Sequence, residues 1–225
     1  MSYQPVAQSD VIFAYVGSAW WIFALAAVIA YFCGCFNGAV IVSKYILRDD
    51  VRNHGSGNAG LTNFHRTFGG ALTAVVILCD VLKAVVAVWI GSVLSSAMLG
   101  AGTAILAKYW AALFCLLGHM FPCMFGFKGG KGVASTLAVM LMTFPIPACI
   151  CYVVAIALIA ATRYVSLGSI TLAALFAAIV LATPWGRWLV IVWVIAISGL
   201  LIWRHHANIG RLLRGEENKL GSKKK

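Results

Sequence analysis

Long apolar stretches separated by short polar ones form the main pattern of this chain. A helix that crosses a lipid bilayer needs about 20 apolar residues, or fewer when it is tilted or packed inside a bundle. The fourth apolar stretch is too short to span comfortably and is ended by Pro145 and Pro147, so we expect a partial helix packed against protein. The pattern predicts seven helices, near 19–46, 69–92, 102–120, 132–143, 145–161, 167–183 and 188–203.

The composition supports the same class. Of the 225 residues, 62% are hydrophobic and 10% are charged, against about 45–50% and about 25% in soluble domains. We therefore predict an all-α polytopic membrane protein, with 1–225 forming a single integral membrane domain. Its polar parts are the loops 47–68, 118–131 and 162–166 and the tail 204–225.

The basic residues predict an orientation. Fourteen Lys and Arg fall in the loops after the first, third and fifth helices and in the tail, whereas Arg187 is alone on the opposite side. By the positive-inside rule these loops and the C-terminus face the cytoplasm and the N-terminus lies outside. No Lys or Arg precedes the first helix, so a cleaved signal peptide is not indicated. We attribute the net charge of +11 to anionic lipid and an anionic substrate, not to nucleic acid.

The loop at 118–135 carries the clearest chemical signal. Its centre, Lys128-Gly129-Gly130-Lys131-Gly132, combines flexible glycines with two ammonium groups and is followed by a predicted helix start. This combination is typical of an anion site, most simply for phosphate. It is not a Walker loop, because Phe125 stands where the first Gly is needed. The alternative is a basic turn that meets lipid headgroups.

A second glycine-rich loop precedes the second helix. Gly55, Gly57 and Gly60 alternate there with short polar side chains, which suit a polyol or a phosphate better than a plain linker. The candidate ligands are Ser56, Asn58, Thr62, Asn63, His65 and Arg66.

Two further polar groups face the same side. Ser166 and Ser169 begin the sixth helix, where either can cap the helix or face a ligand. In the tail, Arg204, Asn208 and Arg211 share one helical face with His205 beside them. This face could close over the glycine loops, or the tail could be an interfacial amphipathic helix.

Polar residues also lie inside the apolar stretches. Asp80 and Lys83 are one helical turn apart, and we expect an ion pair between them or with Lys108, with a relay or substrate contact as the alternative. For Asn37, next to the small residues Gly34 and Cys35, we favour packing over substrate contact.

The sequence limits the chemistry available. It has six carboxylates with no cluster suited to a divalent cation, and no Gly-x-Ser-x-Gly elbow, so we expect neither a metal nor another cofactor. Cations, loop amides and one His suit group transfer from a donor already activated by phosphate. The alternatives are a small organic-phosphate transporter or channel, although no internal repeat is visible, and a metal-dependent lipid phosphotransferase, which would need an intramembrane Asp cluster.

Four stretches in order resemble the bacterial acyl-phosphate:glycerol-3-phosphate acyltransferases. They are GSGNAGLTN from Gly55 with Arg66, Gly118-His119 with Phe121-Pro122, FKGGKGVA from Phe127, and His205 with Asn208-Ile209, Arg211-Leu212-Leu213 and Gly215. Leu61, His206 and Glu216 depart from the family pattern. The resemblance implies seven membrane helices in the bacterial inner membrane and a cytoplasmic site. It also implies acyl transfer from acyl phosphate to the 1-hydroxyl of glycerol 3-phosphate, giving lysophosphatidic acid and phosphate in phospholipid synthesis.

The resemblance also suggests roles for residues. Ser56 and His205 would be catalytic, with Arg66, Lys131, Asn208 and Ser166 contacting glycerol 3-phosphate or the reacting centre. Lys128 and the amides of Gly129, Gly130 and Gly132 would hold the acyl phosphate, and Asn58, Thr62 and Asn63 would complete the substrate site. Membrane lipid is the other expected partner, and a monomer would suffice.

Overall fold

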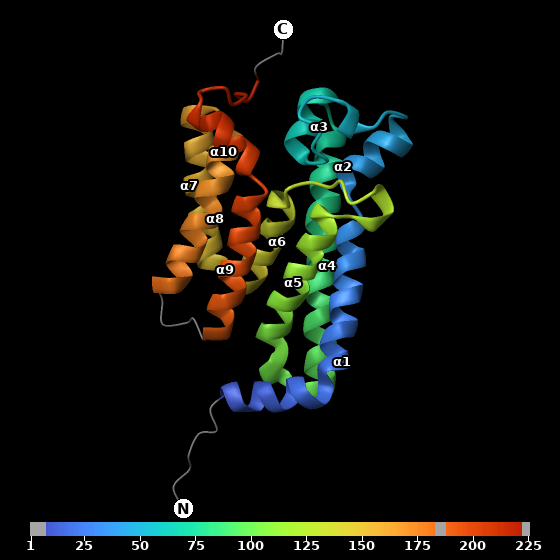
Figure 1. The fold of residues 1–225 in the computed structure, drawn as a ribbon, viewed down its shortest axis with the longest axis vertical. Coiled ribbons are helices and arrows are strands. Elements are labelled where there is room, and N and C mark those ends of the chain that lie inside the picture. Colours follow the sequence, from blue (N-terminus) through green and yellow to red (C-terminus); the bar gives the residue numbers. More distant parts are fainter. Residues whose placement is uncertain (1–7, 183–187, 222–225) are drawn as a thin grey trace, which may run out of the picture.

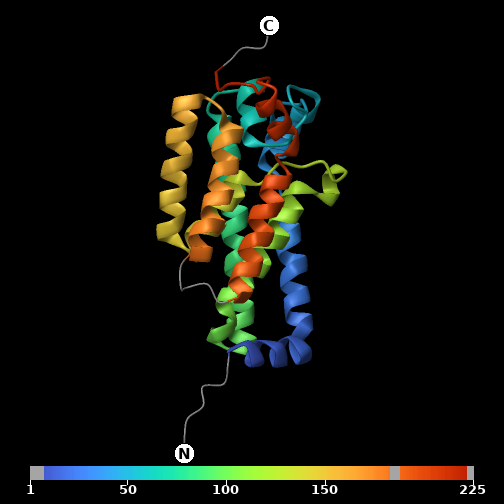
Figure 2. The same ribbon diagram turned by 60° about the vertical axis from the view of Figure 1, so that its left-hand side comes forward.

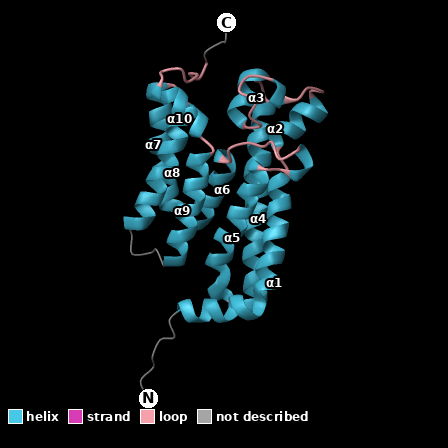
Figure 3. Ribbon diagram, viewed as in Figure 1, coloured by secondary structure: helices cyan, strands magenta, loops and turns pink. Residues whose placement is uncertain are grey.

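The computed structural model describes residues 8–182 and 188–221. All regular elements in these ranges are helices (Figure 3). The expectations that concern Arg187 and 223–225 lie outside them. The longer helices are α1 (Gln8–Cys35), α4 (Leu72–Leu99), α5 (Ala104–Met120), α6 (Val133–Thr143), α7 (Pro145–Thr162), α8 (Val165–Ala182) and α9 (Trp188–Trp203). The shorter ones are α2 (Gly38–Ile41), η1 (Val42–Ile46), η2 (Val51–Asn53), α3 (Leu61–Thr67), η3 (Ala101–Thr103), η4 (Cys123–Phe125) and α10 (His206–Leu213).

The helices confirm the predicted class of membrane protein. Within the described ranges, five helical segments are long and apolar enough to cross a bilayer, and a sixth is formed if α9 and α10 are taken as one bent span. The 11 residues of α6 are too few to span, in line with the partial helix expected there. Seven spans and the orientation of the termini stay predictions.

The first predicted helix, near 19–46, is not continuous. Helix α1 bends at Ala19 and ends at Cys35, and α2 starts a new helix after Phe36 and Asn37. The break is stabilised by Asn37, whose Oδ1 accepts from the Val40 N–H at 3.0 Å and whose Nδ2 donates to the Ala59 carbonyl at 3.1 Å. Asn37 is fully buried, so the expected packing role is confirmed, and this role joins the bundle to the first glycine loop.

Helices α1, α4 and α5 pack along one another and form one side of the molecule (Figure 1). Glycines allow α1 and α5 to touch through their backbones: a Cβ on Gly34 would collide with the Cys115 carbonyl, and one on Gly118 with the Tyr31 carbonyl. Figure 2 shows α7 outermost on the other side, next to α8, and α6 contacts both α4 and α7.

The polar loops gather at one end of the bundle. Helices α2, α3 and α10 lie at the end opposite to the start of α1 (Figure 1). The chain bends by 56° between α9 and α10, so the last helix does not continue straight into the tail. This bend turns α10 towards the loops.

Candidate functional site

A cavity of about 490 Å³ lies beneath these loops. Its walls come from the first glycine loop, the starts of α6 and α8, the first half of α4, the end of α5, the middle of α7, and the tail. The structure thus brings together ten of the residues predicted from sequence: Ser56, Asn58, Thr62, Asn63, Arg66, Lys131, Gly132, Ser166, His205 and Asn208.

The first glycine loop presents Ser56 at a tight turn. Gly55 and Gly57 on either side have φ of 59° and 69°, a region that L-residues with side chains avoid. The Ser56 N–H donates to Asn63 Oδ1 at 3.0 Å, and Asn63 Nδ2 donates to the carbonyls of Val51 and His54, each at 3.0 Å. The buried Asn63 amide is therefore committed to shaping the loop that carries Ser56.

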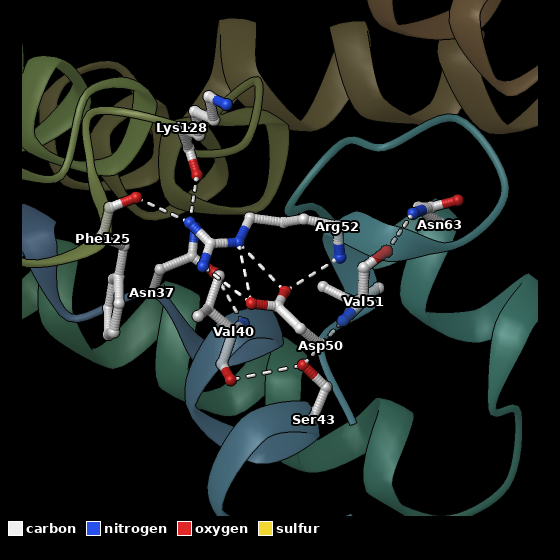
Figure 4. Close-up of polar contacts among 9 residues, drawn as sticks. All are labelled: Asn37, Val40, Ser43, Asp50, Val51, Arg52, Asn63, Phe125 and Lys128. Atoms are coloured by element: carbon white, nitrogen blue, oxygen red, sulfur yellow. Dashed lines mark hydrogen bonds and ion pairs between the residues drawn. The ribbon is translucent and has the colours of Figure 1, made fainter. Parts of the chain in front are cut away.

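Arg52 joins the two glycine loops (Figure 4). Its guanidinium forms a two-pronged ion pair with Asp50, 2.7 Å at the shortest, and donates to the Phe125 carbonyl at 2.6 Å and more weakly to that of Lys128. The hydrogen bonds from Arg52 hold the pKa of Asp50 below its usual range. Arg52 was not among the residues predicted from sequence, because its partners are carbonyl oxygens, which leave no motif.

The Lys-Gly-Gly-Lys-Gly loop is used differently from the predicted cradle. The N–H groups of Gly129 and Gly130 donate to the carbonyls of Met120 and His119, each at 3.1 Å, so both amides are engaged in the backbone. Lys128 is exposed and is not part of the cavity wall. Gly132, with φ of 88°, turns the chain into α6, so the first N–H groups of that helix meet the cavity.

Lys131 begins a polar chain that runs into the tail. Its Nζ donates to Asn208 Oδ1, Asn208 Nδ2 donates to Glu217 Oε1 at 2.8 Å, and Glu217 Oε2 accepts from Arg211 Nε at 2.7 Å. Burial lowers the pKa of Lys131 to about 8, partly opposed by the Glu217 carboxylate. Glu217 was not predicted as a site residue, although it adjoins the tail motif.

His205 has a defined tautomer. It is buried at the start of α10, and its Nδ1 lies 2.8 Å from the Leu201 carbonyl. A carbonyl only accepts, so the Nδ1 carries the proton, and the Nε2 lone pair accepts no hydrogen bond within the described residues. Burial, followed by the Lys131 charge, lowers the pKa of His205 to about 4, so the ring is neutral at physiological pH.

The tail closes over the loops, as its sequence pattern predicted. Arg204 Nη2 donates to the Gly130 carbonyl at 3.0 Å, and Arg66 Nη2 donates to the Asn218 carbonyl at 2.9 Å. Arg163 donates to the Leu220 carbonyl from two of its nitrogens. The second predicted serine, Ser169, donates to the Val165 carbonyl, whereas the buried Ser166 hydroxyl at the cavity has no partner within the described residues.

A buried charged cluster lies at the cavity wall formed by α4 and α5. Lys83 Nζ is 2.8 Å from Asp80 Oδ1, which confirms the predicted ion pair, and 2.7 Å from His119 Nδ1. Asp80 and His119 line the cavity. His119 was missed as a candidate, although the Gly118-His119 motif contains it.

Two ends of the cavity therefore differ in charge. Three cations, Arg66, Lys131 and Arg211, line the cavity where the tail meets the loops. One carboxylate, Glu217, lies among them and is paired with Arg211. The Asp80 wall is electrically balanced by Lys83, with Ile77 one turn away on the same helix. This arrangement suits an anionic group at one end and an apolar chain with a neutral polar group at the other. Within the described residues, no three His, Cys, Asp or Glu are placed to hold a metal ion.

Comparisons with known proteins agree with one another. The family model "Glycerol-3-phosphate acyltransferase" matches residues 24–215. The chain is 40% identical over 199 residues to the glycerol-3-phosphate acyltransferase of Thermoanaerobacter pseudethanolicus, covering 88% of this chain and 96% of that protein. It is 42% identical over 199 residues to that of Halalkalibacterium halodurans, covering 87% and 94%.

Solved structures are similar over the same span. The crystal structure of PlsY (YgiH), an integral membrane glycerol 3-phosphate acyltransferase, in its glycerol 3-phosphate form has a TM-score of 0.79 and 32% identity, covering 88% of this chain and 96% of that one. Its lysophosphatidic acid form has a TM-score of 0.76 and 31% identity, with coverage of 88% and 95%. By sequence over most of its length and by fold, the chain belongs to the glycerol-3-phosphate acyltransferase family of integral membrane proteins.

Proposed function

We propose that this chain transfers a fatty acyl group from acyl phosphate to the 1-hydroxyl of glycerol 3-phosphate, in the cavity beneath the glycine loops. The observation that carries the proposal is the meeting of Ser56, Lys131, His205 and Asn208, from three separate parts of the chain, around one space. The similar PlsY crystal structures are a glycerol 3-phosphate form and a lysophosphatidic acid form, and these two molecules are the acceptor and the product that we propose for this chain.

The cationic end would bind the phosphate of the acceptor. Lys131 and Arg66 can each donate charge-assisted hydrogen bonds to its oxygens, and the start of α6 adds backbone N–H groups. Ser56 and Ser166 would orient the glycerol hydroxyls. Lys128 faces outside the cavity wall, so we propose that it attracts the incoming acyl phosphate, with Gly129, Gly130 and Gly132 shaping the path; Asn58 and Thr62 complete the wall near Ser56.

The reaction then needs alignment more than acid catalysis. The acceptor hydroxyl oxygen bonds to the acyl carbon, and the bond from that carbon to the phosphate oxygen breaks, with phosphate taking the electron pair. Phosphate is a good leaving group, so the site gains most by aligning the reactants and stabilising the oxyanion. The lone pair of His205 Nε2, or the acceptor's own phosphate, takes the hydroxyl proton.

The location follows from the charges. Because basic residues concentrate in the loops and tail that form the site, we propose a multi-pass protein of the bacterial inner membrane, with seven membrane helices, a single domain and the site facing the cytoplasm. The cavity is built from one chain, so a monomer can work alone.

The first test uses detergent-purified protein with glycerol 3-phosphate and palmitoyl phosphate in chelator. We expect phosphate and lysophosphatidic acid to form in equal amounts. If neither forms while glycerol 3-phosphate still binds tightly, an organic-phosphate transporter becomes the better explanation.

The second test concerns the assigned roles. Ser56→Ala and His205→Ala should each lower turnover, His205→Ala by about 10²-fold or more if it is the base. Unchanged turnover in both variants would make the assignment of these two residues wrong while leaving the overall reaction standing.

A further inference from the structure

The cluster of Asp80, Lys83 and His119 is more elaborate than an ion pair requires. All three side chains are buried, with 1%, 6% and 2% of their surfaces exposed. The Lys83 ammonium has three hydrogens, and the structure gives it three acceptors: Asp80 Oδ1 at 2.8 Å, the Phe36 carbonyl at 3.0 Å and His119 Nδ1 at 2.7 Å. Every donor of Lys83 is thereby used.

This geometry fixes the state of the His119 ring. An ammonium can only donate, so Nδ1 of His119 must accept and carries no proton. The ring is then neutral, and its proton is on Nε2. Lys83, held in turn by Asp80, acts as a positioning residue that selects this tautomer.

The Nε2–H has no partner of its own. It makes no hydrogen bond within the described part of the chain, although His119 lines the cavity. Gly130 packs closely against the ring, and the Cβ of any larger residue there would collide with Nε2. Nε2 is not one of the fully buried polar atoms that lack a partner in the described residues, which agrees with its reaching the cavity. An N–H that opens on a cavity is available to a ligand that accepts a hydrogen bond.

The surroundings indicate which ligand atom. The cations of the site are at the tail end, whereas the wall beside His119 contains the balanced Asp80–Lys83 pair and the apolar Ile77. A phosphate dianion would gain little next to the Asp80 carboxylate. A carbonyl oxygen, neutral in the substrate and negative only as the new bond forms, fits this wall better.

We propose that the Nε2–H of His119 donates a hydrogen bond to the carbonyl oxygen of the acyl donor and stabilises the oxyanion that develops during transfer. This inference rests on the proposed function and adds a catalytic residue to it, with Lys83 and Asp80 positioning that residue. No proton is transferred by His119; it keeps its Nε2 proton throughout.

Two substitutions at one position separate this role from packing. His119→Asn places a carbonyl oxygen near the Nδ1 position, so it keeps the bond to Lys83 but loses the donor to the cavity. His119→Gln places an amide N–H₂ near the Nε2 position and keeps the donor. The matched control is His206→Gln, because His206 is exposed, lies outside the cavity wall and has its Nδ1 2.8 Å from the Trp203 carbonyl.

We expect His119→Asn to lower kcat by about 10²–10³-fold, the cost of one oxyanion donor, with KM for glycerol 3-phosphate changed by less than about threefold. His119→Gln should recover at least about tenfold of that loss, and His206→Gln should match the parent chain. The reverse order, in which Asn is tolerated and Gln is not, would show that His119 serves only to pack against Lys83 and would overturn the proposal.

A second measurement does not depend on turnover. In nitrogen NMR of the full-length protein labelled at histidine, His119 should be the neutral Nε2–H tautomer, and Lys83→Met should release this preference. Palmitoylphosphonate keeps the carbonyl of the acyl donor, but a carbon–phosphorus bond replaces the linkage to phosphate, so phosphate cannot leave. Its binding should shift the Nε2 signal, whereas inorganic phosphate should not.

These outcomes keep the two proposals apart. A parent chain that makes no lysophosphatidic acid contradicts the proposed function, yet a shift caused by palmitoylphosphonate alone would still support His119 as a carbonyl donor. If the Nε2 signal does not shift with palmitoylphosphonate, or shifts equally with inorganic phosphate, His119 does not donate to the acyl carbonyl. This outcome would overturn the proposal even in an active enzyme.

Discussion

The ammonium of Lys131 offers the sharpest test of how the cationic end works. We propose Lys131→Met, which keeps the length of the side chain and removes the charge that would meet the acceptor phosphate. A hydrogen bond to a charged group contributes about 1.5–3 kcal/mol, so kcat/KM for glycerol 3-phosphate should fall by about 10- to 150-fold.

The pH dependence should report the same group. Burial lowers the pKa of Lys131 to about 8, so its ammonium loses the proton as pH rises through that value. The parent chain should therefore be near its maximal kcat/KM at about pH 7, fall to about half of it at about pH 8, and lose about tenfold per pH unit well above that value. The acceptor phosphate, with a second pKa of about 6, is already a dianion in this range, and His205, with a pKa of about 4, is already neutral.

The assay follows phosphate release at limiting glycerol 3-phosphate between pH 7 and 9.5. The control is Lys44→Met, since Lys44 is exposed and outside the cavity wall. It should reproduce the parent profile, whereas Lys131→Met should lose the decline above pH 8. If Lys131→Met keeps that decline, another group titrates there and the assignment of Lys131 to phosphate binding is refuted.

Three further substitutions test the surrounding structure. Glu217→Gln removes the carboxylate that raises the pKa of Lys131, so the alkaline decline in kcat/KM should move to lower pH; a decline that stays in place would contradict the coupling. Gly34→Ala should lower the melting temperature by several degrees because its Cβ would strike a backbone carbonyl of α5, whereas Gly199→Ala, with open space around it, should not. Arg52→Lys loses the two-pronged ion pair with Asp50 and the hydrogen bond to the second glycine loop. We therefore expect kcat to fall while the helix content measured by circular dichroism stays the same. Activity equal to that of the parent chain would show that the loops do not need this link.

Part of the site could be predicted because it is local in sequence. Ser56 lies between two glycines, and their positive φ values follow from residue type. The helix that begins after Gly132 follows from apolar spacing. The helical face expected to hold both Arg204 and Asn208 does not form, because α9 ends at Trp203 and the chain bends by 56° before α10 begins at His206. The Asp80–Lys83 pair follows from one helical turn of separation in an apolar medium.

Other features depend on contacts between distant parts of the chain. The amides of Gly129 and Gly130 face carbonyls at the end of α5 instead of a ligand, which no spacing rule could indicate. His119 enters the site only because α4 and α5 pack closely enough for Lys83 to reach its ring. Glu217 becomes part of the site because the chain folds back after α10.

By itself, the sequence determined that this protein lies in a lipid bilayer and which type of chemistry its polar loops can perform. Apolar length required helices in a membrane, because a bilayer leaves backbone groups no other partners, and the glycine loops with their Lys, Arg, Ser and His indicated transfer of a group from a phosphate donor. Tertiary structure decided which donors remain free to act, because each amide or side chain has a limited number of hydrogen bonds and only the packed fold shows which are already used. By that criterion the Nε2 atoms of His205 and His119 make no hydrogen bond within the described residues and remain available at the cavity, whereas the Gly129 and Gly130 amides are already used.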